Sequence, residues 1–133
     1  MTDRPIFVGI ATSGRREVLT ETLKELARQV RRPDRIIVCP AASDDFDGET
    51  AAMLPFPITA VTSPQGTCHQ RNAILDALHD VTDGILIFFD DDFFPLPRYL
   101  AEAEALFENG CDIVVASGLV LADGAPGPGL SVE

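Results

Sequence analysis

Residues 85–92 read Ile-Leu-Ile-Phe-Phe-Asp-Asp-Asp, an apolar run that ends in three carboxylates. A continuous apolar run of this length is typical of a strand buried on both faces, as in a parallel sheet. Ligands of such sheets bind beyond the carboxyl ends of the strands, where Asp90, Asp91 and Asp92 would lie. Because adjacent carboxylates repel one another, we expect a positive partner among them. Mg²⁺ or Mn²⁺ would meet that need, since both take oxygen ligands and commonly bridge carboxylates and substrate phosphates.

The alternative for residues 90–92 is a solvated acidic turn before a helix that Pro97 opens. Two other candidate metal sites have little support. His69 and His79 are separated along the chain, and only His69 falls in an expected ligand-facing loop. Residues 43–48 (SDDFDG) resemble part of a calcium loop but lack its terminal Glu, so we interpret them as a solvated acidic turn.

Apolar segments alternate with helical patterns along the sequence, both before and after residues 85–92. Strands are expected at residues 6–11, 35–39, 58–62, 84–89 and 113–116, with a short sixth at 119–121. Helices are expected at 15–31, 49–54 and 97–110, and around the apolar positions Ile74, Leu75, Leu78 and Val81. The apolar stripe of the first helix is formed by Leu19, Leu23, Leu26 and Val30. This alternation predicts an α/β fold with a mainly parallel sheet flanked by helices.

The carboxyl ends of the strands are expected to form the ligand-binding edge of the sheet, at residues 12–13, 40–45 and 90–92. Arg71 lies in the first turn of an expected helix, behind the loop 64–67. The backbone N–H groups of that loop would approach a phosphate, and Arg71 would then have a functional role next to it. The alternative is that Arg71 is an ordinary surface charge.

The chain is acidic, with 21 acidic and 10 basic residues and a formal charge of −11. This charge repels nucleic acid and an anionic membrane surface, so neither is expected as a partner. No apolar run approaches the roughly 20 residues that span a bilayer, and the start lacks a signal-peptide pattern. Cys39, Cys68 and Cys111 form no CxxC pair and are expected to be reduced, mostly buried thiols. We therefore expect a cytoplasmic chain without a transmembrane segment, still able to work at the inner face of the membrane.

Two common nucleotide signatures are missing from the sequence, the P-loop and the GxGxxG fingerprint. Lys24 is the single lysine and lies in the first expected helix. A phosphoacceptor receiver domain, which needs a lysine after its last strand, is therefore not favoured.

Three stretches of the chain together resemble the family 2 glycosyltransferases, which have the GT-A fold. They are residues 6–15 (IFVGIATSGR), 66–72 (GTCHQRN) and 85–92 (ILIFFDDD), of which the last is similar to the DxD motif of that family. The resemblance runs from Ile6 to about Val120. It implies a Rossmann-like GT-A domain that binds a nucleotide sugar, with a UDP-sugar favoured. The sugar would pass to a hydroxyl of a carbohydrate or lipid-linked acceptor.

The resemblance also implies roles for individual residues. Asp90 would lie near the ribose and diphosphate, and Asp92 would ligate Mn²⁺ or Mg²⁺ together with Asp90. The cation would neutralise charge on the departing diphosphate. The backbone of Ala11, Thr12 and Ser13 would face the nucleobase. The expected nucleotide-binding set is completed by Arg15, Asp91 and Arg71, with Arg71 near the diphosphate.

Two departures from the family pattern affect this interpretation. Family members often carry paired aspartates after the second strand, where this chain has Cys39, Pro40, Ala41 and Ala42, and Asp44 or Asp45 would be the substitute. The acceptor-binding half, with the general base of inverting members, normally follows the strand near residues 113–120. We therefore expect an incomplete GT-A domain at residues 1–121 and a flexible Gly/Pro-rich tail at 122–133. Such a fragment of a longer enzyme would bind the donor but transfer sugar poorly.

Two other functions remain open at the level of the sequence. A sugar-nucleotide pyrophosphorylase also combines an α/β sheet with a metal carboxylate, although its usual Gly-rich basic loop is missing at residues 12–16. A non-catalytic acidic binding module of the same fold is consistent with the missing aspartates after the second strand.

Overall fold

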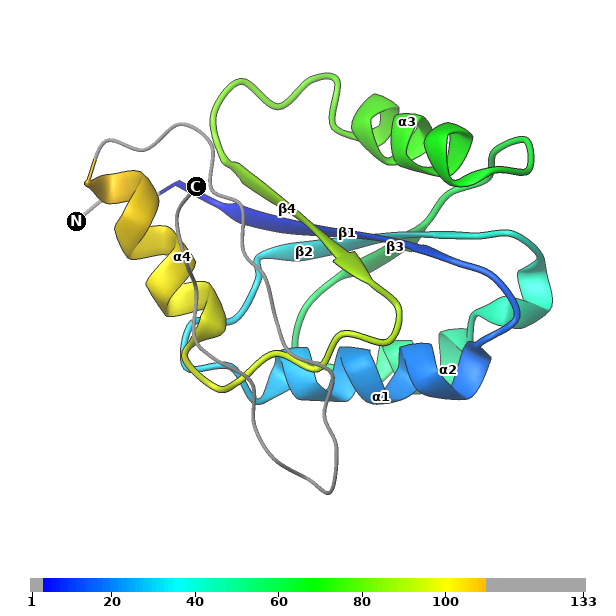
Figure 1. The fold of residues 1–133 in the computed structure, drawn as a ribbon, viewed down its shortest axis with the longest axis horizontal. Coiled ribbons are helices and arrows are strands. Elements are labelled where there is room, and N and C mark those ends of the chain that lie inside the picture. Colours follow the sequence, from blue (N-terminus) through cyan, green and yellow to red (C-terminus); the bar gives the residue numbers. More distant parts are fainter. Residues whose placement is uncertain (1–3, 110–133) are drawn as a thin grey trace.

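Four parallel strands form one sheet in the order β3-β2-β1-β4, so that β1 lies between β2 and β4 (Figure 1). The computed structural model describes residues 4–109. The strands are β1 (Ile6–Thr12), β2 (Arg35–Pro40), β3 (Ile58–Ala60) and β4 (Ile85–Asp90). Each lies within one or two residues of its expected range. The expected α/β fold with a parallel sheet is therefore confirmed for the described residues.

Helices cover both faces of the sheet. On one face lie α1 (Arg16–Ala27), α2 (Gly48–Ala52) and α4 (Tyr99–Glu108), and on the other lies α3 (Thr67–Ala77) (Figure 1). The side chains of β1 alternate between these layers, as the pleat of a strand requires. Ile6, Val8 and Ile10 belong to the core beneath α1 and α4, whereas Phe7 packs with Ile74 of α3.

Gly9 allows α3 to lie close to the centre of the sheet. A Cβ atom at this position would lie 2.8 Å from Cγ2 of Ile74 and 3.2 Å from the ring of Phe88. Atoms at such distances overlap, so a side chain at Gly9 would displace α3 from β1 and β4. The close packing brings the first turn of α3 to the carboxyl ends of the strands.

Helix α1 fixes the course of the chain after β4. The hydroxyl of Thr22 donates a 2.6 Å hydrogen bond to the carbonyl of Asp91. The buried Gln29 donates from Nε2 to the carbonyl of Leu96 at 2.6 Å and accepts from the backbone N–H of Leu100 at 3.0 Å. A segment without regular structure thus has its buried polar groups paired, which holds it in one conformation.

Some local expectations were wrong. Helix α1 ends at Ala27, and the side chain of Val30 is 67% exposed instead of completing the apolar stripe. Leu75 is exposed although it lies within α3, whose buried residues are Gln70 and Ile74, and Val81 is exposed beyond the end of the helix at Ala77. Cys39 is buried, but Cys68 is exposed.

Other expectations fall outside the described residues. The strands at 113–116 and 119–121, Cys111, the helix stop at Gly110 and the tail at 122–133 all lie there. Between residues 4 and 109, no helix is long and apolar enough to cross a membrane.

Candidate functional site

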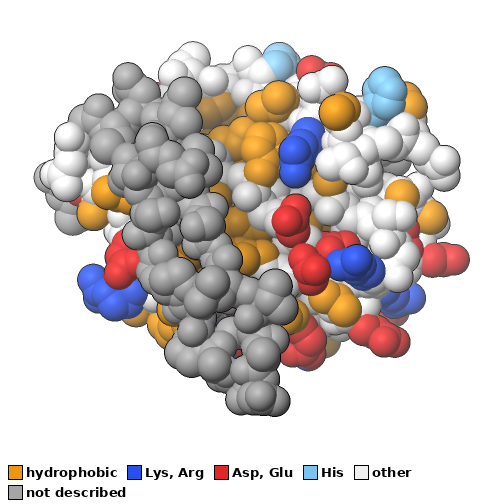
Figure 2. Space-filling model, in the orientation of Figure 1, with side chains coloured by type: hydrophobic (Ala, Val, Ile, Leu, Met, Phe, Trp, Pro, Cys, Tyr) orange, Lys and Arg blue, Asp and Glu red, His pale blue; other side chains and the backbone are white. Residues whose placement is uncertain are grey.

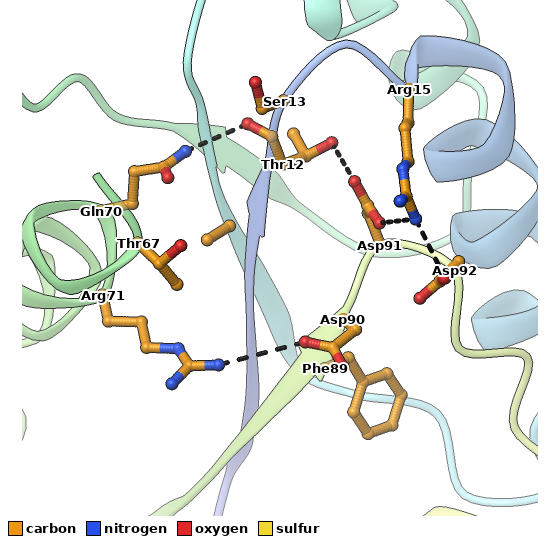
Figure 3. A pocket seen from close by; sticks show the side chains of 11 residues that line it. Thr12, Ser13, Arg15, Thr67, Gln70, Arg71, Phe89, Asp90, Asp91 and Asp92 are labelled. Atoms are coloured by element: carbon orange, nitrogen blue, oxygen red, sulfur yellow. Dashed lines mark hydrogen bonds and ion pairs between the residues drawn. The ribbon is translucent and has the colours of Figure 1, made fainter. Parts of the chain in front are cut away.

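A cavity of about 400 Å³ opens at the carboxyl ends of β1 and β4, beside the first turn of α3 (Figure 3). Acidic and basic side chains gather on this face of the molecule (Figure 2). The structure brings together on the cavity the residues expected to bind the nucleotide and the metal ion: Ala11, Thr12, Ser13, Arg15, Arg71, Asp90, Asp91 and Asp92. Three further residues also line it, namely Thr67, Gln70 and Phe89.

Asp91 differs from its two neighbours because it is buried, with 8% of its surface exposed. Its Oδ2 atom accepts a 2.8 Å hydrogen bond from the hydroxyl of Thr12, towards which the side chain points (Figure 3). Its Oδ1 atom lies 3.4 Å from Nη1 of Arg15. Both carboxylate oxygens thus have a partner within the protein, so Asp91 joins the end of β4 to the end of β1.

Asp90 and Asp92 remain accessible, and each lies near a different arginine. The Asp92 side chain is 55% exposed, and its Oδ2 atom lies 2.9 Å from Nη1 of Arg15. The Asp90 side chain is 79% exposed, and its Oδ1 atom lies 4.0 Å from Nη2 of Arg71. The guanidinium of Arg71 also lies over the ring of Phe88, 5.8 Å from its centroid. Ion pairs this exposed hold their partners weakly, so these side chains are free to exchange partners when a ligand binds.

Gln70 is a structural residue of the site that the sequence analysis missed. It is 5% exposed, and its Nε2 atom donates to the carbonyls of Thr12 at 3.0 Å and Cys39 at 2.8 Å. The side chain therefore ties the ends of β1 and β2 together below the cavity. The available signal was its spacing from Ile74, because residues four apart on a helix share a face.

Asp44 and Asp45, the expected substitutes for the paired aspartates, do not line the cavity. They lie in a 3₁₀ turn at Ser43–Asp45, where Oδ2 of Asp45 accepts a 3.1 Å hydrogen bond from the backbone N–H of Ala42. The carboxyl end of β2 thus contributes no carboxylate to the site. His69 and His79 also lie outside the cavity lining.

The family model described as "Glycosyl transferase family 2" matches residues 7–124. The chain belongs to glycosyl transferase family 2. This confirms the family resemblance that residues 6–15, 66–72 and 85–92 together indicated.

Several solved structures share the fold at low identity. TarS of S. aureus is 19% identical with a TM-score of 0.59, and the match covers 79% of this chain and 20% of that one. A structure of TarS 1–349 is 21% identical with a TM-score of 0.59, covering 79% and 32%. Mannosyltransferase PcManGT from Pyrobaculum calidifontis, in complex with GDP-Man and Mn²⁺, is 24% identical with a TM-score of 0.61, covering 86% and 35%.

These likenesses confirm the expected Rossmann-like GT-A fold. The chain spans about a fifth to a third of the length of the solved structures that it matches. No curated protein sequence matches it.

The carboxylates of this family 2 domain fit a cation that is shared with a ligand. In the part of the chain that the structure describes, no three His, Cys, Asp or Glu side chains are arranged to hold a metal ion by themselves. Asp90 and Asp92 nevertheless offer accessible oxygen atoms on one cavity. Mg²⁺ and similar ions commonly bind through one or two carboxylates together with substrate phosphates and water. Asp90 and Asp92 are thus the residues that would hold a divalent cation.

Proposed function

We propose that this domain binds the nucleoside diphosphate of a nucleotide sugar, together with Mn²⁺ or Mg²⁺, and serves the transfer of the sugar to an acceptor hydroxyl. The observation that carries the proposal is the pairing of two accessible carboxylates with two arginines on one cavity at the carboxyl ends of parallel strands. Carboxylates offer ligands for a cation, and arginines offer bidentate donors for phosphate. A metal-bound diphosphate needs both.

In the proposed reaction the acceptor oxygen forms a bond to the anomeric carbon of the sugar. The bond from that carbon to the diphosphate oxygen breaks, and the electron pair leaves with the diphosphate. Arg15 and Arg71 would stabilise the charge that develops on the leaving oxygens, because preorganised donors act most strongly where charge appears. A bound divalent cation would add Lewis-acid stabilisation of the same charge. The proton of the acceptor hydroxyl passes to a general base, a role that we assign to no residue among 4–109.

The same site supports a proposal for the donor. Ala11, Thr12 and Ser13 end β1 at the cavity, where their backbone would face the nucleobase. The solved complex of the Pyrobaculum mannosyltransferase with GDP-Man and Mn²⁺ supports a donor of this class. We propose a UDP-sugar or a GDP-sugar as donor and a carbohydrate or lipid-linked hydroxyl as acceptor, with the domain working in the cytoplasm.

Calorimetric titration with UDP and with GDP, in Mn²⁺ and in chelator, tests this function. We expect binding that depends on Mn²⁺ and that is lost in Asp92→Ala. Asp44→Ala is the matched control, because Asp44 is exposed and lies outside the cavity. Binding that persists unchanged in Asp92→Ala would contradict the proposed site.

One observation favours a non-catalytic binding module as the second candidate. The end of β2 offers Ala41 and Ala42 where a carboxylate would hold the base and ribose, and Asp45 is bonded to the Ala42 backbone. A folded chain that binds neither nucleotide, with or without Mn²⁺, would favour that module.

A further inference from the structure

One guanidinium lies against two of the three aspartates of the site. Nη1 of Arg15 is 2.9 Å from Oδ2 of Asp92 and 3.4 Å from Oδ1 of Asp91 (Figure 3). Asp92 is one of the two residues that would hold the divalent cation. The arginine therefore already pairs with a carboxylate on which the cation would bind.

A guanidinium and a divalent cation on the same carboxylate repel each other. Arginine stays charged at every accessible pH, so it cannot relieve the repulsion by losing a proton. Two positive groups held a few ångströms apart repel strongly at a protein surface, where the effective dielectric constant is well below that of water. As long as the arginine stays at Asp92, it therefore weakens the binding of the cation there.

A diphosphate provides the arginine with another partner. The planar guanidinium matches phosphate oxygens with two parallel hydrogen bonds, and the charged ligand would enter the cavity that Arg15 already lines. Once Arg15 has turned to the phosphate, Asp92 is released for the cation. Binding of the diphosphate thus favours binding of the cation, and binding of the cation favours binding of the diphosphate.

When Arg15 turns away, Oδ1 of Asp91 loses its 3.4 Å contact with Nη1 of Arg15, but the other bonds of the site remain. The Arg15 side chain is 53% exposed and makes no capping bond to α1. Asp91 keeps its hydrogen bond from the Thr12 hydroxyl, and its backbone carbonyl keeps the one from Thr22. Only the long arginine side chain has to change conformation.

We propose that Arg15 acts as the counter-ion of Asp92 in the nucleotide-free domain and gives way to the cation only when a nucleoside diphosphate arrives. The cation and the nucleotide then bind as a coupled pair, and the cation alone binds weakly. This inference rests on the proposed function, because it requires that both ligands use the same cavity.

Binding of Mn²⁺ to the purified chain, followed by the electron paramagnetic resonance signal of the free ion, tests the coupling. Titrations are run without nucleotide and with saturating UDP or GDP, on the wild type and on Arg15→Gln, with Arg15→Ala as a second variant. Arg16→Gln is the matched control, since Arg16 is 52% exposed and pairs with Asp47 at 3.6 Å outside the cavity. Circular dichroism confirms that each variant is folded.

In Arg15→Gln we expect the nucleotide-free affinity for Mn²⁺ to rise by about fivefold or more, the lower end of ordinary coupling between two ligands. The factor by which nucleotide tightens Mn²⁺ binding should fall correspondingly. Arg16→Gln should leave both quantities near the wild-type values, because a distant charge is screened by salt.

Two results would overturn the inference. Equal changes in Mn²⁺ affinity in Arg15→Gln and Arg16→Gln would show that the effect comes from the net charge of the chain and not from the contact of Arg15 with Asp92. A lower Mn²⁺ affinity in Arg15→Gln would show that the arginine supports the cation. If both ligands bind but these results are found, the proposed function stands and the inference fails. If Arg15→Gln tightens Mn²⁺ binding but no nucleotide binds, the competition at Asp92 stands and the proposed function fails.

Discussion

The hydroxyl of Thr12 donates a 2.8 Å hydrogen bond to Oδ2 of Asp91, and this bond continues the pairing of β1 with β4 beyond their last backbone pair. The final backbone pair of the two strands is Ala11 with Asp90. Thr12 and Asp91 are 2% and 8% exposed, so the bond is shielded from water. Because the carboxylate of Asp91 is directed to Thr12, its two neighbours in the acidic run are left to serve the cavity.

Replacing Thr12 by valine should therefore destabilise the domain. Valine fills a similar volume but leaves the buried Asp91 oxygen without its donor, which costs about 1–3 kcal/mol. Urea denaturation of the purified chain measures this loss. Thr20→Val is the control, because the Thr20 hydroxyl bonds only to the Arg16 carbonyl of its own helix. Equal stability of the two variants would mean that the Thr12 bond contributes nothing.

Gln70→Glu should cause a larger loss than the similar shape of the two side chains suggests. The amide of Gln70 donates to the carbonyls of Thr12 and Cys39, whereas a carboxylate has no proton to donate and repels both oxygens. We expect a loss of about 2–4 kcal/mol in urea denaturation, since a buried charged group would be left unpaired. Gln65→Glu, in the exposed loop before α3, is the matched control. A loss of the same size in the control would contradict this role of Gln70.

The sheet could be predicted from the sequence because its strands are apolar runs whose burial requires no knowledge of their neighbours. Residues 84–89 were expected as a strand, and β4 spans Ile85–Asp90. The end of α1 was harder to place. Val30 continues the helical spacing, but its backbone N–H donates to the carbonyl of Pro97, far along the chain. A tertiary hydrogen bond thus overrode the local pattern.

The site was predictable only in part for the same reason. Adjacent carboxylates after a strand indicate a ligand-binding edge, and the cavity lies there. The sequence does not distinguish Asp91 from its neighbours, because the partner that buries it, Thr12, is 79 positions away. Gln70 reaches carbonyls 58 and 31 positions away. Which polar residue is structural and which faces a ligand depends on such distant pairs.

Gly9→Ala should destabilise the domain, although glycine in a strand interior normally costs stability. The new Cβ atom would meet Ile74 at 2.8 Å and Phe88 at 3.2 Å, so α3 would have to shift. Overpacking of this kind costs about 1–3 kcal/mol. Gly48→Ala is the contrasting control, because the nearest atom to its added Cβ lies 3.8 Å away and Gly48 lies in α2. Thermal melts should show a lower midpoint for Gly9→Ala and an unchanged or higher one for Gly48→Ala. The opposite order would contradict the close packing of α3 on β1.

Asp47 should make part of the stability dependent on acid pH. The hydrogen bond from the Thr50 hydroxyl, aided by the Thr50 backbone N–H, lowers the pKa of Asp47 from its usual value of 3.8. A carboxyl whose pKa is lower in the folded chain contributes stability that is present above the unfolded pKa and lost as the pH falls through the folded pKa. The contribution should thus be complete near neutral pH and disappear as the pH falls below about 4.

Thermal midpoints of the wild type and Asp47→Asn, measured from pH 7 down to pH 3, should converge on acidification. Asp44 is exposed and caps no helix, so the thermal midpoint of Asp44→Asn should change with pH in the same way as that of the wild type. A wild-type advantage over Asp47→Asn that stays constant with pH would show that the Thr50 contacts do not depend on the charge of Asp47.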